Sequence, residues 1–305
     1  MAAVAKKEED GAMQQVRGTI TEAAIAYGRY LRRNKSLTVG IALLLGLIAF
    51  AWIGGLLVDP QNARPLSARV LQSPSWALPF GSDRQGRNLF AVITTGTLLT
   101  LRIGLIAGFI GVAIGATLAF VAGYYGGWID NVVRIVVDVG LTVPSLMVLI
   151  VVALALREGM TVNIMAFVIA SLAWLYPART IRSQVLTLRE RAYVQIARMS
   201  GTSGPGIIAK ELLPNLLPYL MASLVGSVSA AILASIGLDV LGLGVFEAPT
   251  LGMTLYWVNF TGALINGWWW WWLAPIIVVG ILFISLFLIS IGLDEIANPR
   301  LRLRV

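Results

Sequence analysis

The sequence predicts an all-α membrane protein with six transmembrane helices and cytoplasmic termini. Its 305 residues are 58% hydrophobic and 12% charged, whereas soluble domains are about a quarter charged. Long apolar runs recur along the chain, and helices are the way such runs satisfy their backbone polar groups in lipid. Lys and Arg gather in alternate connections between these runs, which is the usual mark of membrane topology.

The apolar runs divide the chain into segments. A polar N-terminal segment, residues 1–36, is expected to hold an interfacial helix around residues 19–33, and residues 37–58 form the first span. An extracytoplasmic segment, 59–97, precedes a core of residues 98–293, and residues 294–305 form a cytoplasmic tail. The other five expected spans, all in the core, are residues 98–123, 132–156, 162–176, 219–242 and 273–293.

The distribution of positive charge predicts which way the spans face. The segment up to Lys35 holds seven Lys or Arg residues, a polar loop at residues 179–217 holds six, and the tail holds three. On the other side, residues 59–97 hold four, residues 157–161 one and residues 245–272 none. Because cytoplasmic loops collect Lys and Arg, both termini and the polar loop are expected in the cytoplasm.

Composition also excludes several classes of function. The chain has no Cys and no His, so disulfides, thiolate or imidazole metal sites and His-dependent catalysis are excluded, and we expect no catalytic residue and no metal site. The low charge argues against a soluble nucleic-acid-binding protein. The phosphate-binding pattern G-x-x-x-x-G-K-[ST] does not occur, so any ATP that drives this protein must bind to another subunit.

The polar loop at 179–217 predicts a helix–turn–helix at the membrane surface. Thr187–Glu190 fits a capping box, although the fourth span could instead simply continue. A helix from there would stop at Gly201, and a second short helix, Ile207–Leu213, would end at Pro214. Such a pair either docks into a partner's groove or is a solvated connection. The first helix would carry one stripe of Tyr193, Ile196, Ala197 and Ser200.

Other features of the spans have structural and functional interpretations. Arg134 and Asp138 are four residues apart and are expected to pair on one helix face. Asp239, near the outer end of its span, either faces a pathway or makes a structural hydrogen bond. The run Trp268–Trp272 predicts an aromatic belt at the outer interface, with stacking on sugar rings as the alternative. Close helix packing is expected at Gly104, Gly108, Gly111 and Gly115.

Ordered motifs carry a resemblance to a known family. Glu190-x5-Ile196-Ala197-x3-Gly201, followed by Leu213-Pro214-Asn215, resembles the EAA loop of permease subunits in bacterial ATP-driven importers. Phe80–Asn88, Gly123–Asp130, Leu241–Gly244 and Asn298–Arg300 also resemble segments of the second permease of the oligopeptide, dipeptide and nickel class. The chain departs from the family at Ile196, where Ala is usual, and in the order of Ser235 and Asp239.

The resemblance implies a type I ABC importer permease without chemistry of its own. It implies a homologous second permease, two ATP-binding subunits that hold ATP and Mg²⁺, and an extracytoplasmic solute-binding protein, in a bacterial or archaeal inner membrane and with no nucleic acid. Peptides are the expected solute and oligosaccharides the alternative; a secondary transporter or channel is the rival class. It implies ATPase coupling by Glu190, Tyr193, Ile196, Ala197, Gly201 and Pro214. Expected pathway residues are Asp138, Ser235 and Asp239, and expected docking or gate residues are Asp83, Arg87, Trp268 and Trp269.

Overall fold

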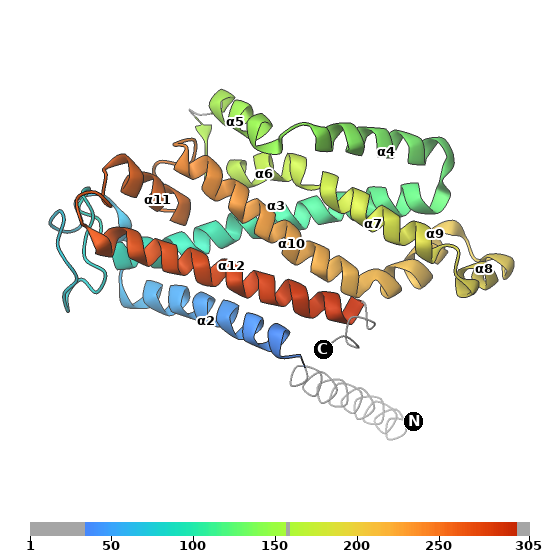
Figure 1. Ribbon diagram of the computed structural model, residues 1–305, viewed down its shortest axis with the longest axis horizontal. Coiled ribbons are helices and arrows are strands. Elements are labelled where there is room, and N and C mark those ends of the chain that lie inside the picture. The colour runs from blue at the N-terminus through green and yellow to red at the C-terminus, as the bar shows by residue number, and fades with distance from the viewer. Residues whose placement is uncertain (1–33, 157–158, 298–305) are drawn as a thin grey trace, which may run out of the picture.

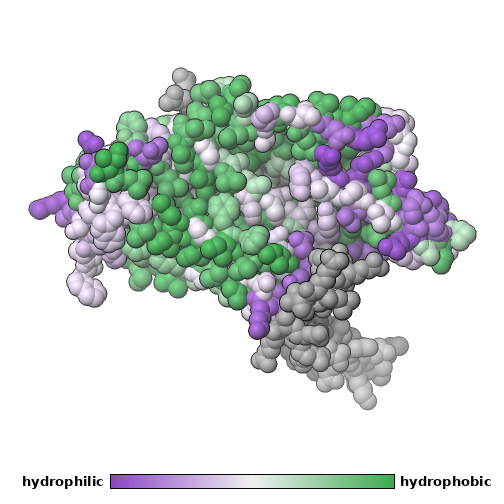
Figure 2. All heavy atoms as spheres, in the orientation of Figure 1, coloured by the Kyte–Doolittle hydropathy of each residue, from purple (hydrophilic) through white to green (hydrophobic). Residues whose placement is uncertain are grey.

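The protein is a bundle of long helices that run roughly along one axis (Figure 1). The computed structural model describes residues 34–156 and 159–297, so the expected interfacial helix at 19–33 and the Asn298–Arg300 motif lie outside the described residues. Four helices are long and apolar enough to cross a membrane, or up to six if each of two bent pairs counts as one span. Hydrophobic side chains cover the middle of the face in Figure 2, with hydrophilic ones toward its ends. The predicted all-α membrane class is therefore confirmed.

The first and last spans are antiparallel neighbours, α2 (Lys35–Leu57) and α12 (Trp269–Ala297). Asn34 caps α2, because its side-chain oxygen accepts from the Leu37 N–H at 3.0 Å. Its side-chain nitrogen donates to the Gly292 carbonyl of α12, also at 3.0 Å. The beginning of α2 and the end of α12 therefore lie at the same end of the bundle, which is also the end that carries α8 and α9 (Figure 1).

The centre of the bundle is the pair α3 (Leu89–Tyr125) and α10 (Leu213–Val240). A methyl group added at Gly108 would lie 2.8 Å from backbone atoms of Val228, so the two helices approach closely there, as the small residues predicted. The helix α3 begins at Leu89, nine residues before the expected start of the second span. Asn88 caps this start by accepting from the Phe90 N–H at 3.0 Å.

Each of the third and fourth spans is broken. In the third, α4 (Gly127–Thr142) and α5 (Ser145–Ala155) meet at 81°, so the apolar run at 132–156 forms a bent pair of helices. Pro144 explains the break, because it cannot donate a helical hydrogen bond and it disfavours helical backbone at the residue before it. In the fourth, α6 (Val162–Ala173) and α7 (Leu175–Leu188) meet at 41°.

The continuation of the fourth span into the polar loop is confirmed, and the capping box at Thr187 was wrong. Thr187 lies inside α7, where its hydroxyl donates to the Ser183 carbonyl at 3.1 Å. The predicted short helix ending at Pro214 was also wrong. The helix α9 (Gly204–Ile207) passes through a π-helical turn, Ile208–Leu212, directly into α10. Pro214 is tolerated because it lies in the first turn of α10.

At the opposite end, the connection before α12 contains a helix that the sequence reading missed. This helix, α11 (Leu251–Phe260), is capped by Thr250, whose hydroxyl accepts from the Met253 N–H at 3.1 Å. The Leu251 N–H donates to the Thr100 hydroxyl of α3, which fixes the same end of α11. Residues 58–88 form a second connection there, with one 3-10 turn at Pro60–Ala63.

Candidate functional site

The polar loop presents a short helix, α8 (Ala192–Met199), at the end of the bundle (Figure 1). Val194 anchors it, because this side chain is fully buried in a cluster with Val185 of α7 and Ile207 of α9. Tyr193 and Ala197 pack against the same cluster. Burial raises the pKa of the Tyr193 hydroxyl, which has no hydrogen-bond partner among the described residues.

The opposite face of α8 is free of contacts with the rest of the described chain. Ile196 is 59% exposed and Met199 is 80% exposed, and Ser200 is exposed beside them. Exposure differs along the predicted stripe: Tyr193 and Ala197 are partly buried against the cluster, whereas Ile196 and Ser200 are exposed. Two large apolar side chains on a polar helix surface are typical of a docking site.

The end of α8 agrees with the predicted glycine stop. Gly201 adopts a left-handed conformation with φ of 77°, which a residue with a side chain adopts only under strain. The Thr202 N–H donates to the Ala197 carbonyl, and the Gly201 N–H donates to the Arg198 carbonyl, both at 3.1 Å. These two bonds form a Schellman motif, which turns the chain back toward α9.

Polar contacts fix the polar loop to the C-terminal end of α3. Arg189 donates to the Gly123 carbonyl at 2.8 Å and pairs with Glu190 at 2.9 Å, which leaves the Glu190 side chain 65% exposed. The Arg198 guanidinium lies 5.7 Å from the centre of the Tyr124 ring, within cation–π range. The loop is therefore held by α3 at two points, in addition to its apolar anchor.

The acid of α4 that forms an ion pair is not the predicted one. Asp130 pairs with Arg182 of α7 through two hydrogen bonds, whereas the ion pairs of the described residues do not include Arg134 with Asp138. Arg134 instead donates to the Asn131 side chain at 3.4 Å. A bidentate Arg–carboxylate pair fixes the relative orientation of its two groups. Because this pair joins two helices, it holds α4 against α7.

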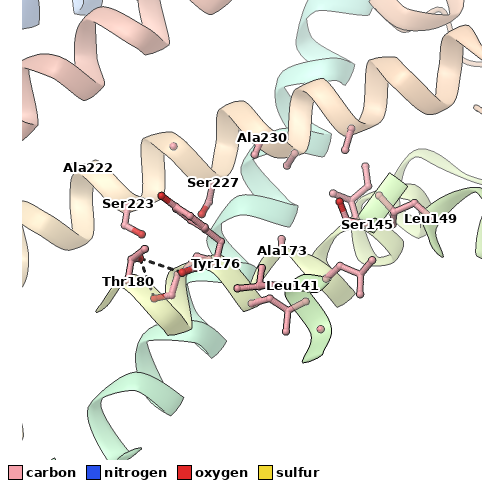
Figure 3. A pocket seen from close by; sticks show the side chains of 18 of the residues that line it. Leu141, Ser145, Leu149, Ala173, Tyr176, Thr180, Ala222, Ser223, Ser227 and Ala230 are labelled. Carbon is pink, nitrogen blue, oxygen red and sulfur yellow. Dashed lines mark hydrogen bonds between the residues drawn. The ribbon is translucent and has the colours of Figure 1, made fainter. Parts of the chain in front are cut away.

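A cavity of about 670 Å³ opens between the bent spans and α10. Figure 3 shows Tyr176 and Thr180 of α7 and Ser223 and Ser227 of α10 among the side chains that line it. The lining is small and apolar apart from hydroxyl groups, and among the described lining residues Asp294 of α12 is the charged one. Such a surface offers weak hydrogen bonds without a strong binding centre.

The residues predicted to lie on the pathway are not in the lining of this cavity. Ser235 and Asp239 are fully buried, and the Asp239 carboxylate accepts from the Thr250 hydroxyl at 2.7 Å. Of the two interpretations of Asp239, the structure therefore shows the hydrogen bond. Asp138 lines a separate pocket of about 180 Å³ together with Arg179 and Arg182.

At the opposite end of the bundle, the residues predicted for docking stabilise the structure of the segment of residues 58–88 and the start of α12. Asp83 and Arg87 form an ion pair at 2.6 Å, and both side chains are buried, so neither presents a charged surface in the structure. Of the Trp run, Trp271 is fully buried, while Trp269 is 53% exposed. The Trp270 side chain donates to the Ser82 carbonyl at 3.3 Å, which ties the start of α12 to the segment of residues 58–88.

Comparisons with known proteins identify the family of the chain. Residues 111–303 match the family of the binding-protein-dependent transport system inner membrane component. The chain belongs to this permease family. It is similar to the dipeptide transport system permease protein DppC of Alkalihalophilus pseudofirmus, with 32% identity over 72% of each chain. It is also 30% identical to DppC of Bacillus subtilis, over 90% of this chain and 85% of that protein. Over 90% of this chain and 93% of the relative, it is 29% identical to the oligopeptide transport system permease protein OppC of Mycobacterium bovis.

This permease is a multi-pass protein of the bacterial inner membrane and a subunit of an ABC importer, and a permease subunit of this family is not itself an enzyme. Its described residues bring together the polar loop, the C-terminal end of α3 and the start of α10. Three features of this arrangement were missed in the sequence: the anchor Val194, the Asp130–Arg182 pair and the cavity. A signal existed for Val194, because it lies three residues before Ala197 on one helical face.

Proposed function

We propose that this permease forms half of a pathway for short peptides and that α8 is the surface through which a separate ATPase subunit moves it. The single observation that carries the proposal is the outward face of α8, where Ile196 and Met199 are exposed on a helix that is otherwise anchored. An exposed apolar pair on a short, anchored helix suits an apolar groove of a partner.

The proposal places α8 in the cytoplasm. Lys35, Arg191, Arg198 and Lys210 lie in or beside the elements that Figure 1 places at the same end of the bundle. Positive residues concentrate on the cytoplasmic side of membrane proteins, which supports cytoplasmic termini. ATP and Mg²⁺ then belong to two ATP-binding subunits on that side, and this chain holds neither.

The structure offers a physical route from α8 to the cavity. Because α8 is fixed to α3 by Arg189 and leads through the π-helical turn into α10, a push on α8 displaces both helices. The cavity lies between α10 and the bent spans, so this displacement changes its width. A homologous second permease would close the open side of the pathway, and alternating access would follow from closure of the ATPase subunits.

Peptides are the proposed solute, because similar proteins are dipeptide, oligopeptide and glutathione transport permeases. The hydroxyl groups that line the cavity suit passing peptide groups of varied sequence. Oligosaccharides are less well supported, since the Trp run buries Trp271 and uses Trp270 for a structural bond. A solute-binding protein would deliver the peptide to the opposite end, where Trp76, Leu66 and Ile265 are highly exposed.

Co-purification with the ATPase subunit tests the proposal. Ile196→Asp places a charge on the docking face and should reduce recovery of the ATPase by about tenfold or more, since it desolvates a carboxylate without a partner. Ile265→Asp is the matched control, because it makes the same change at a residue that is 93% exposed at the opposite end, and it should leave recovery unchanged. Equal recovery with both variants would refute docking at α8, and solute uptake without any ATPase would establish a secondary carrier.

A further inference from the structure

An arginine lies on an exposed side of α3, and no described residue of the chain neutralises it. Arg102 is exposed, and within the part of the chain that the structure describes it has neither a hydrogen bond nor an ion pair. Leu98, Leu105 and Phe109 share its helical face and are 37%, 56% and 65% exposed. The result is an uncovered apolar stripe with one positive charge in it.

The depth of Arg102 can be worked out from helix contacts. Near the outer end of α2, Gly54 packs against Thr94 and Phe90 of α3. Arg102 lies two helical turns beyond Thr94, which is about 12 Å at 1.5 Å per residue. The hydrocarbon core is about 30 Å thick, so Arg102 lies near its middle. A charged side chain facing lipid at this depth is costly, and such residues usually face protein or a water-filled cavity.

The cavity described above does not explain Arg102, because α3 contributes no residue to its lining. Within the described residues, a second copy of this chain offers no carboxylate at this depth either. Among the described acids, Asp239 is fully buried and the others, apart from Asp138, lie in the connections or near helix ends. Asp138 lies about 18 Å along α4 from the turn at Gly126, whereas Arg102 lies about 36 Å from that turn along α3, so the two are at different depths. No described residue of this chain therefore offers a counter-ion to Arg102 at this depth.

We infer that the stripe Leu98–Arg102–Leu105–Phe109 packs against a helix of a second, non-identical permease subunit, which places a carboxylate opposite Arg102. The inference rests on the proposed function, because it takes a second permease as the occupant and adds the surface and the charge that select it. The apolar side chains of the stripe supply the packing area between the two helices. Arg102 selects the partner, because association with a chain that lacks the acid would leave its charge unpaired.

Assembly of the complex tests this inference. The tagged chain is expressed together with its neighbouring transport genes, and the second permease that co-purifies is quantified by mass spectrometry. Arg102→Leu should reduce its recovery about tenfold, which is the scale of an interhelical polar contact in membranes. Arg102→Lys keeps the charge and should retain most of the recovery. Arg84→Leu makes the matched change at an exposed arginine outside the spans and should have no effect.

A photo-cross-linking residue at Leu105 identifies the occupant directly. The inference expects a cross-link to the second permease that Arg102→Leu weakens. Cross-links to phospholipid alone, cross-links to a second copy of this chain, or full recovery of the complex with Arg102→Leu would each overturn it. Absence of any second permease from the wild-type complex would instead refute the proposed function, so the two failures are distinguishable.

Discussion

The contact between α10 and α11 permits a quantitative prediction. Thr250 makes two buried bonds with one hydroxyl: it donates to Asp239 at 2.7 Å and accepts from the Met253 N–H at 3.1 Å. Thr250→Val keeps the shape and removes both. Leaving the buried Asp239 oxygen without a donor costs about 1–3 kcal/mol, and loss of the helix cap costs about 1 kcal/mol. The total is roughly 2–4 kcal/mol of unfolding free energy.

The assay is thermal unfolding of the purified permease in detergent, followed by the fluorescence of its ten Trp residues. For a chain of this size each kcal/mol shifts Tm by about 2–4 °C, so Thr250→Val should lower Tm by roughly 4–16 °C. Thr250→Ser keeps both bonds and should stay close to wild type. If the Val and Ser variants unfolded within about 2 °C of each other, the hydroxyl would have no structural role and the argument for this contact would fail.

Two further predictions concern helix packing and solute charge. Gly108→Ala puts a methyl 2.8 Å from the backbone of Val228 and should destabilise the protein by about 1–3 kcal/mol. Gly46→Ala meets nothing within 4 Å and should stabilise it by up to about 1 kcal/mol, so equal Tm shifts would contradict close α3–α10 packing. Asp294→Lys reverses the charge at the cavity and should slow uptake of a cationic peptide relative to an anionic one. An unchanged ratio of uptake rates would exclude Asp294 from the pathway.

The sequence predicted the spans better than their shape. Apolar length is a property of each segment, so α2 and α12 lay close to their predicted positions. The break at Pro144 was visible in the sequence, but its 81° angle depends on packing against other helices. The sequence carried no visible signal for the π-helical turn before α10. Pro214 alone suggested the end of a helix, whereas in the structure it lies in the first turn of α10.

The candidate site was also predicted only in part, because local features are visible in the sequence and tertiary contacts are not. Gly201 was recognisable as a helix stop because a left-handed residue is a local requirement. Which face of α8 points outward depends on the cluster around Val194, which residues far apart in the sequence form together. The buried environments of Asp83 and Asp239 likewise come from tertiary contacts, so the sequence alone could not separate a structural carboxylate from an exposed one.

The central claim is that the outward face of α8 is held by an ATPase subunit in the assembled importer. The most direct measurement is a cross-link from a single cysteine, Met199→Cys, in a chain that has no cysteine of its own. The account predicts a cross-link to the ATP-binding subunit and protection of this thiol from a water-soluble reagent in the intact complex. A thiol that reacts equally in the complex and in the isolated permease, with no cross-link to the ATP-binding subunit, would contradict it.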